Sequence, residues 1–395
     1  MRIAYVALIE IDVANACLIH TREIGEQWAR LGHEVTVLLP KPLRKQAWSG
    51  VRHAWVRWWG FDWPRQLAFI GESAWRLIRL HRARPFDLLY VRELTVRPGL
   101  AWLLRRMRLP YFVEVNGWVL DEMRMMGASA RALRVARRTQ GRILSGASGI
   151  VASTTGNADK VIREYGIPTE RVMVQELGTN AEHFLPGDRR RARLALALPQ
   201  EGPVILFAGS FHPHHDLSTM VKAFASLGEA EQRPWLLLVG YGTTWDAVRK
   251  QCESLGIADR VLLPGSRPYE AMPLYFQAAD IAVLPLTGAN IRQRNGCITL
   301  KLWDYMAAGL PVLVTDFQDT PSAAILMGKV YSVKPEDPDA MAAGLRDLLR
   351  QENLRRRLGQ TGLDYVRKHR TWRQAAEDTL RFIEDRLATT RSHRP

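Results

Sequence analysis

A short stretch near residue 300 combines groups that can hold a nucleotide diphosphate. Residues 299–308 repeat apolar side chains at helical spacing, and residues 312–314 that follow have the character of a buried strand. Lys301 lies in the first turn of the predicted helix, where free backbone amides already favour an anion. Asp304, one turn further on the same face, can accept hydrogen bonds from sugar hydroxyls. The stretch therefore predicts a phosphate and sugar site. The alternative is an ordinary surface helix whose Lys and Asp are solvated.

Four polar side chains in the first half of the chain follow predicted strands. These strands cover residues 3–8 and 111–115, and each leads through a loop into a helix. In an open parallel sheet, ligands bind beyond the carboxyl ends of the strands, so side chains in these loops are candidates for contact with a substrate. The alternative is that they cap helices or turns. The candidates are Asn15, His20, Asn116 and Glu122.

Glycines and polar residues follow the predicted strands of the second half in the same way. A glycine at a strand end lets a ligand approach the backbone. The loop at 210–216 also carries three histidines, which suggests a metal site, but no cysteine or second acidic cluster accompanies them. Imidazole beside a phosphate is therefore the favoured interpretation. The residues expected at this edge are Gly209, Ser210, His215, Gly240, Tyr241 and Arg267.

Tryptophan and arginine are interleaved at unusual density between residues 48 and 79. Amphipathic aromatic rings among cations suit a membrane interface or a surface that stacks on sugars. The alternative is that the tryptophans form a local core under a long loop. The stretch contains Trp48, Trp55, Trp58, Trp59, Trp63 and Trp75 among Arg52, Arg57, Arg65, Arg76 and Arg79.

The composition is that of a globular protein with a strong positive charge. The 395 residues carry a formal net charge of +15, and no apolar run reaches the roughly 18 residues of a membrane-spanning helix. Glu10 and Asp12 interrupt the apolar start, which is expected to be a first strand rather than a signal peptide. Three scattered cysteines predict neither disulfides nor a zinc site and favour a cytoplasmic location. No nucleic-acid-binding motif is present, so an anionic substrate or membrane surface is left to explain the charge.

Strands and helices alternate along the chain, and the alternation restarts after a segment rich in Arg, Gly and Pro at 186–203. This pattern predicts an α/β fold of two doubly wound, Rossmann-like domains. The first loop lacks the Gly-x-Gly-x-x-Gly run of dinucleotide-binding proteins. We expect an N-terminal domain at residues 1–186, a C-terminal domain at 187–370 and a final helix at 371–388.

The ordered set of segments resembles the GT-B glycosyltransferases of family 4. The pieces MRIAYVALIE, ASGIVASTTG, FAGSFHPHHDLSTMVKAFA, LLLVGYG and LKLWDYMAAGLPVLVTD follow one another in that family's order, and the last is the most specific. The resemblance spans nearly the whole chain. It implies two Rossmann-like domains facing a cleft, with the nucleotide sugar held by the C-terminal domain. It also implies that the last helix crosses back to the N-terminal domain.

Several positions match or depart from the family's motifs. Asp304 stands where the family usually has a glutamate that binds the donor ribose, and Lys301 matches a lysine beside it. His215 takes the place of a diphosphate-binding lysine, and Ser210 that of a diphosphate-binding arginine. Asn116 stands where a histidine is common.

The departures remove fixed positive charge that would stabilise the leaving phosphate. The first glutamate of the family's paired motif falls at Gly296 and is missing. Lys301, Arg292, Arg294 and the helix amides are expected to compensate for the lost charge.

The resemblance implies a retaining, metal-independent glycosyltransferase of the hexosyltransferase type. It would move a sugar from a nucleotide diphosphate sugar to a glycan, a lipid-linked or a small-molecule acceptor. The N-terminal domain would select the acceptor, at the cytoplasmic membrane face if the acceptor is lipid-linked. The implied catalytic residues are Asn116, His215 and Lys301; the donor-binding residues are Gly209, Ser210, Gly240, Tyr241, Arg267, Thr299, Leu300 and Asp304; the acceptor-side residues are Asn15, His20 and Glu122.

Two other functions fit the same sequence. The missing cations allow a catalytically impaired partner protein that binds a nucleotide sugar. A GT-B sugar epimerase also fits the fold, but it gives no reason for the tryptophan-rich stretch.

Overall fold

The chain forms two compact α/β units in the computed structural model, which describes residues 1–12, 15–43, 46–57, 63–92, 98–227, 233–288, 298–315 and 323–392. Unit 1 consists of Met1–Leu177 and Trp372–Pro395, and unit 2 consists of Gly178–Thr371. The division falls earlier in the chain than the predicted limit at residue 186. The reason is that Phe184 packs in unit 2, with its ring centroid 5.0 Å from that of Phe276.

Unit 1 is built on a parallel sheet of seven described strands in the order β3-β2-β1-β4-β5-β6-β7. Most of its strands are almost completely buried, as expected when helices cover both faces of a parallel sheet. The strands are β1 (Arg2–Ala7), β2 (Glu34–Pro40), β3 (Arg52–Val56), β4 (Leu88–Arg92), β5 (Tyr111–Val115), β6 (Gly149–Ala152) and β7 (Val172–Val174).

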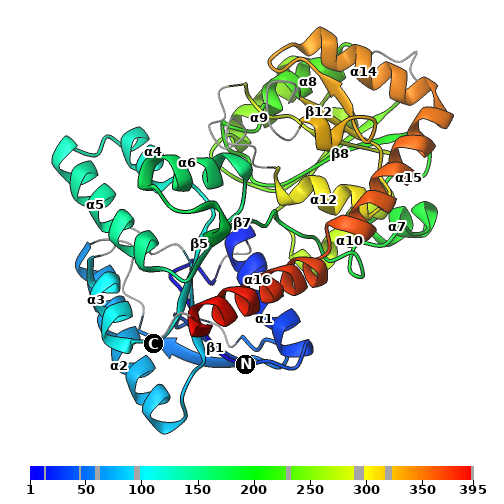
Figure 1. The fold of residues 1–395 in the computed structure, drawn as a ribbon. Coiled ribbons are helices and arrows are strands. Elements are labelled where there is room, and N and C mark those ends of the chain that lie inside the picture. Colours follow the sequence, from blue (N-terminus) through cyan, green and yellow to red (C-terminus); the bar gives the residue numbers. More distant parts are fainter. Residues whose placement is uncertain are drawn as a thin grey trace. The chain divides into compact units, whose positions relative to one another are not determined.

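Helices cover the two faces of this sheet (Figure 1). On one face α16 packs beside α1, and the indole Nε1 of Trp28 donates to the carbonyl of Ala376 at 3.3 Å. The predicted final helix therefore joins the N-terminal part of the chain. The helices of unit 1 are α1 (Ala16–Arg30), α2 (Trp63–Ala83), α3 (Pro98–Met107), α4 (Val119–Met125), α5 (Ala130–Gly146), α6 (Thr155–Tyr165) and α16 (Trp372–Ser392).

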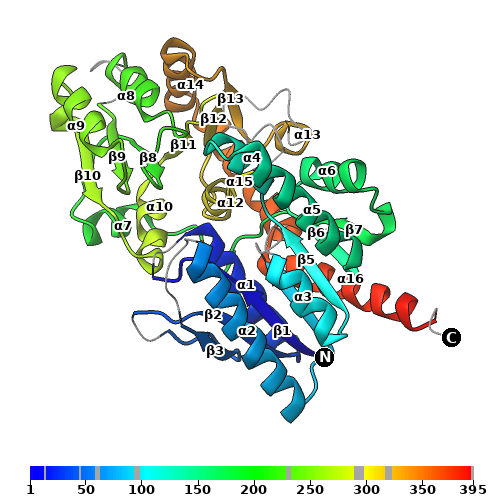
Figure 2. The ribbon, with the colours of Figure 1, turned by 90° about the vertical axis from the view of Figure 1, so that its left-hand side faces the viewer.

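Unit 2 repeats this plan with a parallel sheet of six described strands in the order β10-β9-β8-β11-β12-β13 (Figure 2). Its strands are β8 (Val204–Ala208), β9 (Trp235–Val239), β10 (Val261–Gly265), β11 (Ile281–Leu284), β12 (Val312–Thr315) and β13 (Tyr331–Val333). Its helices are α7 (Arg189–Ala195), α8 (Leu217–Ala225), α9 (Trp245–Ser254), α10 (Met272–Ala278), α12 (Leu300–Ala307), α13 (Ala323–Leu326), α14 (Pro338–Arg350) and α15 (Glu352–His369).

The helix predicted near residue 300 is α12, and its surroundings differ from the prediction. Thr299 is its N-cap, and Gly309 follows its C-terminus with φ = +73°, in the left-handed region that glycine tolerates. The predicted helix is present, but it is more buried than a surface helix, because seven of its eight residues are buried. The interpretation of Lys301 and Asp304 as solvated surface residues is excluded for Asp304, which is only 7% exposed.

The tryptophan-rich stretch forms regular structure instead of a long loop. It contains strand β3 at the edge of the sheet and most of helix α2. Trp48 is buried, as the core interpretation expects, whereas Trp75 is 55% exposed and has the Arg79 guanidinium 5.5 Å from its ring centroid. Trp58 and Trp59 lie outside the described residues.

Candidate functional site

The strand order of unit 2 places a binding edge where β8 and β11 meet. Connections leave these neighbouring strands in opposite directions, and ligands of open α/β sheets bind at such a switch point. The loop after β8 crosses this edge, and His215 forms an isolated antiparallel bridge with Leu286, which follows β11. The sequence-predicted residues of this loop therefore lie at the expected edge.

Tyr305 fixes helix α12 against the end of β8. Its hydroxyl accepts from the backbone N–H of Ala208 at 2.7 Å and donates to the carbonyl of the same residue at 3.1 Å. Burial raises the pKa of Tyr305 well above its ordinary value, so the hydroxyl stays protonated and can fill both roles. This double contact places the first turn of α12 beside the loop that follows β8.

Two glycines are required by close approaches at this edge. A Cβ on Gly209 would lie 2.0 Å from Cε of Lys301, so the lysine side chain occupies the space that any other residue would fill. A Cβ on Gly240 would lie 1.8 Å from the carbonyl oxygen of Gly209, which is backbone and cannot move aside. The sequence argument expected the glycines to admit a ligand. The structure shows that they first admit Lys301 and the neighbouring backbone.

His215 and Lys301 differ in charge and therefore in role. Nδ1 of His215 donates to the carbonyl of Ser210 at 2.7 Å, so Nε2 carries the lone pair and accepts from the Lys301 amine at 3.4 Å. Burial and the nearby lysine lower the pKa of His215 to about 2, and the ring is neutral. Burial lowers the pKa of Lys301 to about 8, so this amine is mostly protonated at neutral pH. Lys301 therefore supplies the charge, and His215 holds the lysine.

Thr299 caps the N-terminus of α12, and Asp304 lies in the second turn of the same helix. Oδ1 of Asp304 accepts from the hydroxyl of Thr179 at 2.5 Å, a partner that the sequence analysis did not identify. The hydroxyl of Thr299, at the N-cap, is buried and has no hydrogen-bond partner among the described residues. A buried hydroxyl beside free helix amides is suited to an anion's oxygen atoms.

Other predicted donor residues lie apart from this arrangement. Tyr241 is 60% exposed and packs on Trp245, with ring centroids 5.2 Å apart. Arg267 is exposed, and its Nε donates to the hydroxyl of Tyr275 at 2.9 Å. Leu300 is buried in α12 and offers a ligand only its backbone. No group of histidine, cysteine, aspartate or glutamate suited to a metal occurs in the described residues.

Of the four candidate residues in unit 1, Asn15 has a structural role and Glu122 lies beside a turn. Asn15 is the N-cap of α1, and its side chain accepts from the backbone N–H of Leu18 at 2.9 Å. Glu122 lies in α4 so close to Gly117 that a Cβ on this glycine would be 2.8 Å from its Oε1. The capping alternative therefore holds for Asn15, and Glu122 lies beside the strand-end turn.

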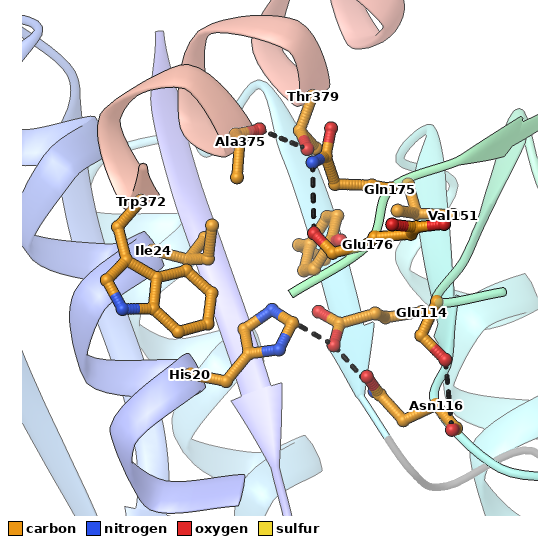
Figure 3. A pocket seen from close by; sticks show the side chains of 12 residues that line it. His20, Ile24, Glu114, Asn116, Val151, Gln175, Glu176, Trp372, Ala375 and Thr379 are labelled. Carbon is orange, nitrogen blue, oxygen red and sulfur yellow. Dashed lines mark hydrogen bonds and ion pairs between the residues drawn. The ribbon is translucent and has the colours of Figure 1, made fainter. Parts of the chain in front are cut away.

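The other two, His20 and Asn116, meet at a buried carboxylate that the sequence analysis missed. Glu114 in β5 is only 2% exposed and forms an ion pair with the equally buried Arg92. It also lies 3.4 Å from Nε2 of His20 and accepts from Nδ2 of Asn116 at 2.6 Å (Figure 3). Glu114, His20 and Asn116, with Trp372 and others, line a cavity of about 10 Å³, the size of one water molecule.

The charges in this cluster are fixed by its partners. Burial opposes ionisation of Glu114, but Arg92, His20 and the hydrogen bonds from Asn116 and Tyr90 together outweigh it, so the pKa of the Glu114 carboxyl lies below its ordinary value. Burial lowers the pKa of His20 to about 4, so the ring is neutral near pH 7. An ionised carboxylate only accepts hydrogen bonds, so the amide nitrogen of Asn116 must face Glu114. The carbonyl Oδ1 of Asn116 is therefore turned away from Glu114 and is presented as an acceptor.

Arg292, Arg294 and Gly296 lie outside the described residues. The sequence offered a signal for Glu114, because a charged residue inside the strand at 111–115 interrupts an apolar run. No pattern in the sequence pointed to Thr179 or to Arg92.

Two family descriptions match successive parts of the chain. "Glycosyl transferases group 1" matches residues 188–364, and "Glycosyl transferase 4-like domain" matches residues 18–178. A D-inositol 3-phosphate glycosyltransferase of Streptomyces avermitilis is 30% identical over 231 residues. That match covers 55% of this chain, and the chain spans about half the length of that relative, 48%.

Solved structures share the fold over almost the whole chain. Sucrose-phosphate synthase of Thermosynechococcus elongatus has a TM-score of 0.77 at 19% identity, with 98% of this chain and 99% of that chain covered. Anabaena HepE in complex with UDP-glucose has a TM-score of 0.74 at 15% identity, with 98% and 100% covered. At these identities the likeness shows the fold, which is GT-B.

The buried cluster around Glu114 gives a stability prediction. Glu114→Ala should lower the free energy of unfolding by about 3–5 kcal/mol, because Arg92 keeps its buried charge and loses the carboxylate. Replacing both, as Arg92→Met with Glu114→Leu, should recover a large part of the loss. Asp159→Ala, at an exposed helical position, is the matched control and should change stability by less than about 0.5 kcal/mol. Urea unfolding measures all of these, and equal losses for Glu114→Ala and Asp159→Ala would contradict the cluster's importance.

Proposed function

The chain belongs to the family-4 type of GT-B glycosyltransferases, and on this premise we propose that it transfers a sugar from a nucleotide diphosphate sugar to an acceptor hydroxyl with retention at the anomeric carbon. The arrangement around Lys301 carries the proposal. It combines one protonated amine, the first turn of a helix and a carboxylate, Asp304, at the end of a parallel sheet. Phosphates favour the first two groups, and sugar hydroxyls favour the third.

The proposed reaction needs charge where the leaving group forms. The bond between the anomeric carbon and the phosphate oxygen breaks, and both electrons remain on the nucleotide diphosphate. Lys301 and the amides of α12 stabilise that negative charge without a metal ion. The acceptor oxygen attacks from the same face, and its proton passes to the leaving phosphate oxygen. Asp304 holds the donor's ribose in this scheme, supported by Thr179.

Asn116 is proposed to act on the acceptor. Its Oδ1 is turned away from Glu114 and can accept a hydrogen bond from the attacking hydroxyl. Glu114 positions the amide, because it binds the nitrogen end. Asn116 would orient the hydroxyl and would not remove its proton, since an amide is not a base at neutral pH. The acceptor is a glycan, a small molecule or a lipid-linked sugar at the cytoplasmic membrane face.

A second candidate function follows from the neutral His215. A lysine at this position would add a positive charge beside the phosphates, and the imidazole adds none. If Lys301 and the helix amides do not suffice, the protein binds a nucleotide sugar without transferring it. A sugar epimerase remains a third candidate on the same fold.

The first experiment tests donor binding and transfer. Pure protein titrated with UDP-, GDP- and ADP-sugars should bind at least one, and the mass of the product formed with cell extract should distinguish transfer, epimerisation and binding alone. Lys301→Ala and Asp304→Ala should each weaken donor binding by about 1–3 kcal/mol, the scale of a charge-assisted hydrogen bond. Asn116→Ala should keep donor affinity and lower turnover. If no donor binds, or if both unit 2 variants titrate like the wild type, the proposed site is wrong.

The titration of Lys301 predicts a pH dependence. Its pKa is about 8, so its positive charge is present below that pH and is lost as the pH rises through it. If only the protonated amine binds phosphate, the Kd for the donor's nucleotide diphosphate should rise by about tenfold between pH 7 and pH 9. Lys301→Arg keeps its charge over this range and should show little change. Calorimetric titration measures both, and an equal rise in the arginine variant would assign the effect to another group.

A further inference from the structure

Helix α5 presents a row of arginines on its exposed side. Successive residues of an α-helix are 100° apart, so the four arginine side chains fall within an arc of about 80° and extend along about 16 Å of the helix. All four are exposed, and the helix contains no acidic residue. The row consists of Arg131, Arg134, Arg138 and Arg142.

The arginine row lacks the ion pairs that other exposed arginines have. Arg249 and Arg373, for example, bind carboxylates one helical turn away at 3.0 and 2.9 Å. Within the described part of the chain, no carboxylate pairs with any of the four side chains of the row. Unpaired like charges repel one another, so a surface of this kind attracts a partner with many negative charges.

One end of the row opens into a basic hollow. A depression of about 710 Å³ is lined by Arg138 and Arg142 of the row together with Arg108, Tyr111 and other residues. Guanidinium groups bind phosphate through paired hydrogen bonds. The hollow therefore suits a phosphate-bearing head group.

Exposed apolar side chains lie just before the row in the chain and within α5 itself. Met125, at the end of α4, is 67% exposed, and Met126 beside it is 87% exposed. Val135, which lies next to the row on α5, is 47% exposed. Apolar side chains gathered on a charged surface mark a place where part of the protein leaves water.

We propose that this face of unit 1, the arginine row with its hollow and the two methionines, docks on an anionic membrane surface. Lipid phosphates neutralise the arginines, and the methionines enter the boundary between head groups and acyl chains. A nucleic acid or an anionic glycan would match the charge but would give the methionines nothing to bury in. None of the described helices has the length and apolarity to cross a bilayer, so the contact is peripheral.

The docking face lies close in the chain to the proposed acceptor residue. Helix α4 begins three residues after Asn116 and ends at Met125. On the proposed function, this makes a lipid-borne acceptor the favoured class, because the membrane would hold the acceptor near Asn116. The docking itself does not depend on sugar transfer.

Sedimentation with vesicles tests the docking. The wild type should sediment with vesicles of phosphatidylcholine and phosphatidylglycerol, and should remain in solution with phosphatidylcholine alone. The fourfold change of Arg131, Arg134, Arg138 and Arg142 to Glu should weaken this binding by tenfold or more. The matched control changes four exposed arginines of unit 2 to Glu, namely Arg190, Arg191, Arg357 and Arg367, so that its net charge equals that of the row variant. This control should bind vesicles like the wild type.

Substitution of the methionines distinguishes a membrane from other polyanions as the partner. Met125→Ser with Met126→Ser should reduce the vesicle binding that survives added salt, whereas binding to DNA or heparin should not change. The docking is overturned if the wild type stays in solution with anionic vesicles at low salt, if the unit 2 control loses as much binding as the row variant, or if the serine variant binds vesicles like the wild type.

Donor titration of the same proteins separates this inference from the proposed function. A row variant that binds the donor normally and has lost the vesicles supports docking and shows that the variant is folded. A wild type that binds vesicles but no donor supports docking and contradicts the proposed function. A row variant that binds neither is replaced by Arg134→Glu with Arg138→Glu, which must lose vesicle binding while donor binding persists.

Discussion

The unit 2 site depends on a lysine amine held where its charge costs free energy. The Lys301 side chain passes over Gly209, in a space that any side chain at position 209 would fill. The neutral imidazole of His215 accepts a hydrogen bond from the lysine amine. Burial lowers the pKa of this amine, so an incoming phosphate is the group that restores its preference for the charged form. Gly209 leaves space for the Lys301 side chain, His215 orients it, and Tyr305 anchors α12. On the proposed function, the interaction between this buried amine and the donor's phosphates contributes to catalysis.

Unit 1 pairs the charges of its buried cluster, whereas one row of charges on its surface has no ion pairs among the described residues. The buried Glu114 is matched by Arg92 and satisfied further by Asn116, which fixes the direction of one amide. On its surface, the arginine row of α5 has no carboxylates, so its attraction is directed outward. The overall charge of +15 is thus partly concentrated on one helix instead of being spread evenly.

The sequence predicted the fold better than the site because fold signals are local. Buried strands such as 111–115 and 312–315 are continuous in the chain, and the sequence predicted them to within one residue of their observed limits. Strand β3 was missed because Arg52, His53 and Trp55 make it resemble a surface segment. The partnership of Thr179 with Asp304 spans 125 residues, so no local pattern could reveal it. The neutral state of His215 was equally hidden, since it follows from burial and from Lys301.

Hydrogen–deuterium exchange with nucleotide diphosphates tests the central claim, that the donor's phosphates bind at Lys301 and the first turn of α12. Exchange is compared with and without UDP, GDP and ADP, for the wild type and Lys301→Ala. The account predicts that at least one nucleotide slows exchange at the backbone amides of residues 209–211 and 299–304, and that the variant loses this protection at the same nucleotide concentration. Protection confined to unit 1, or none at α12 with a nucleotide that binds, would contradict it.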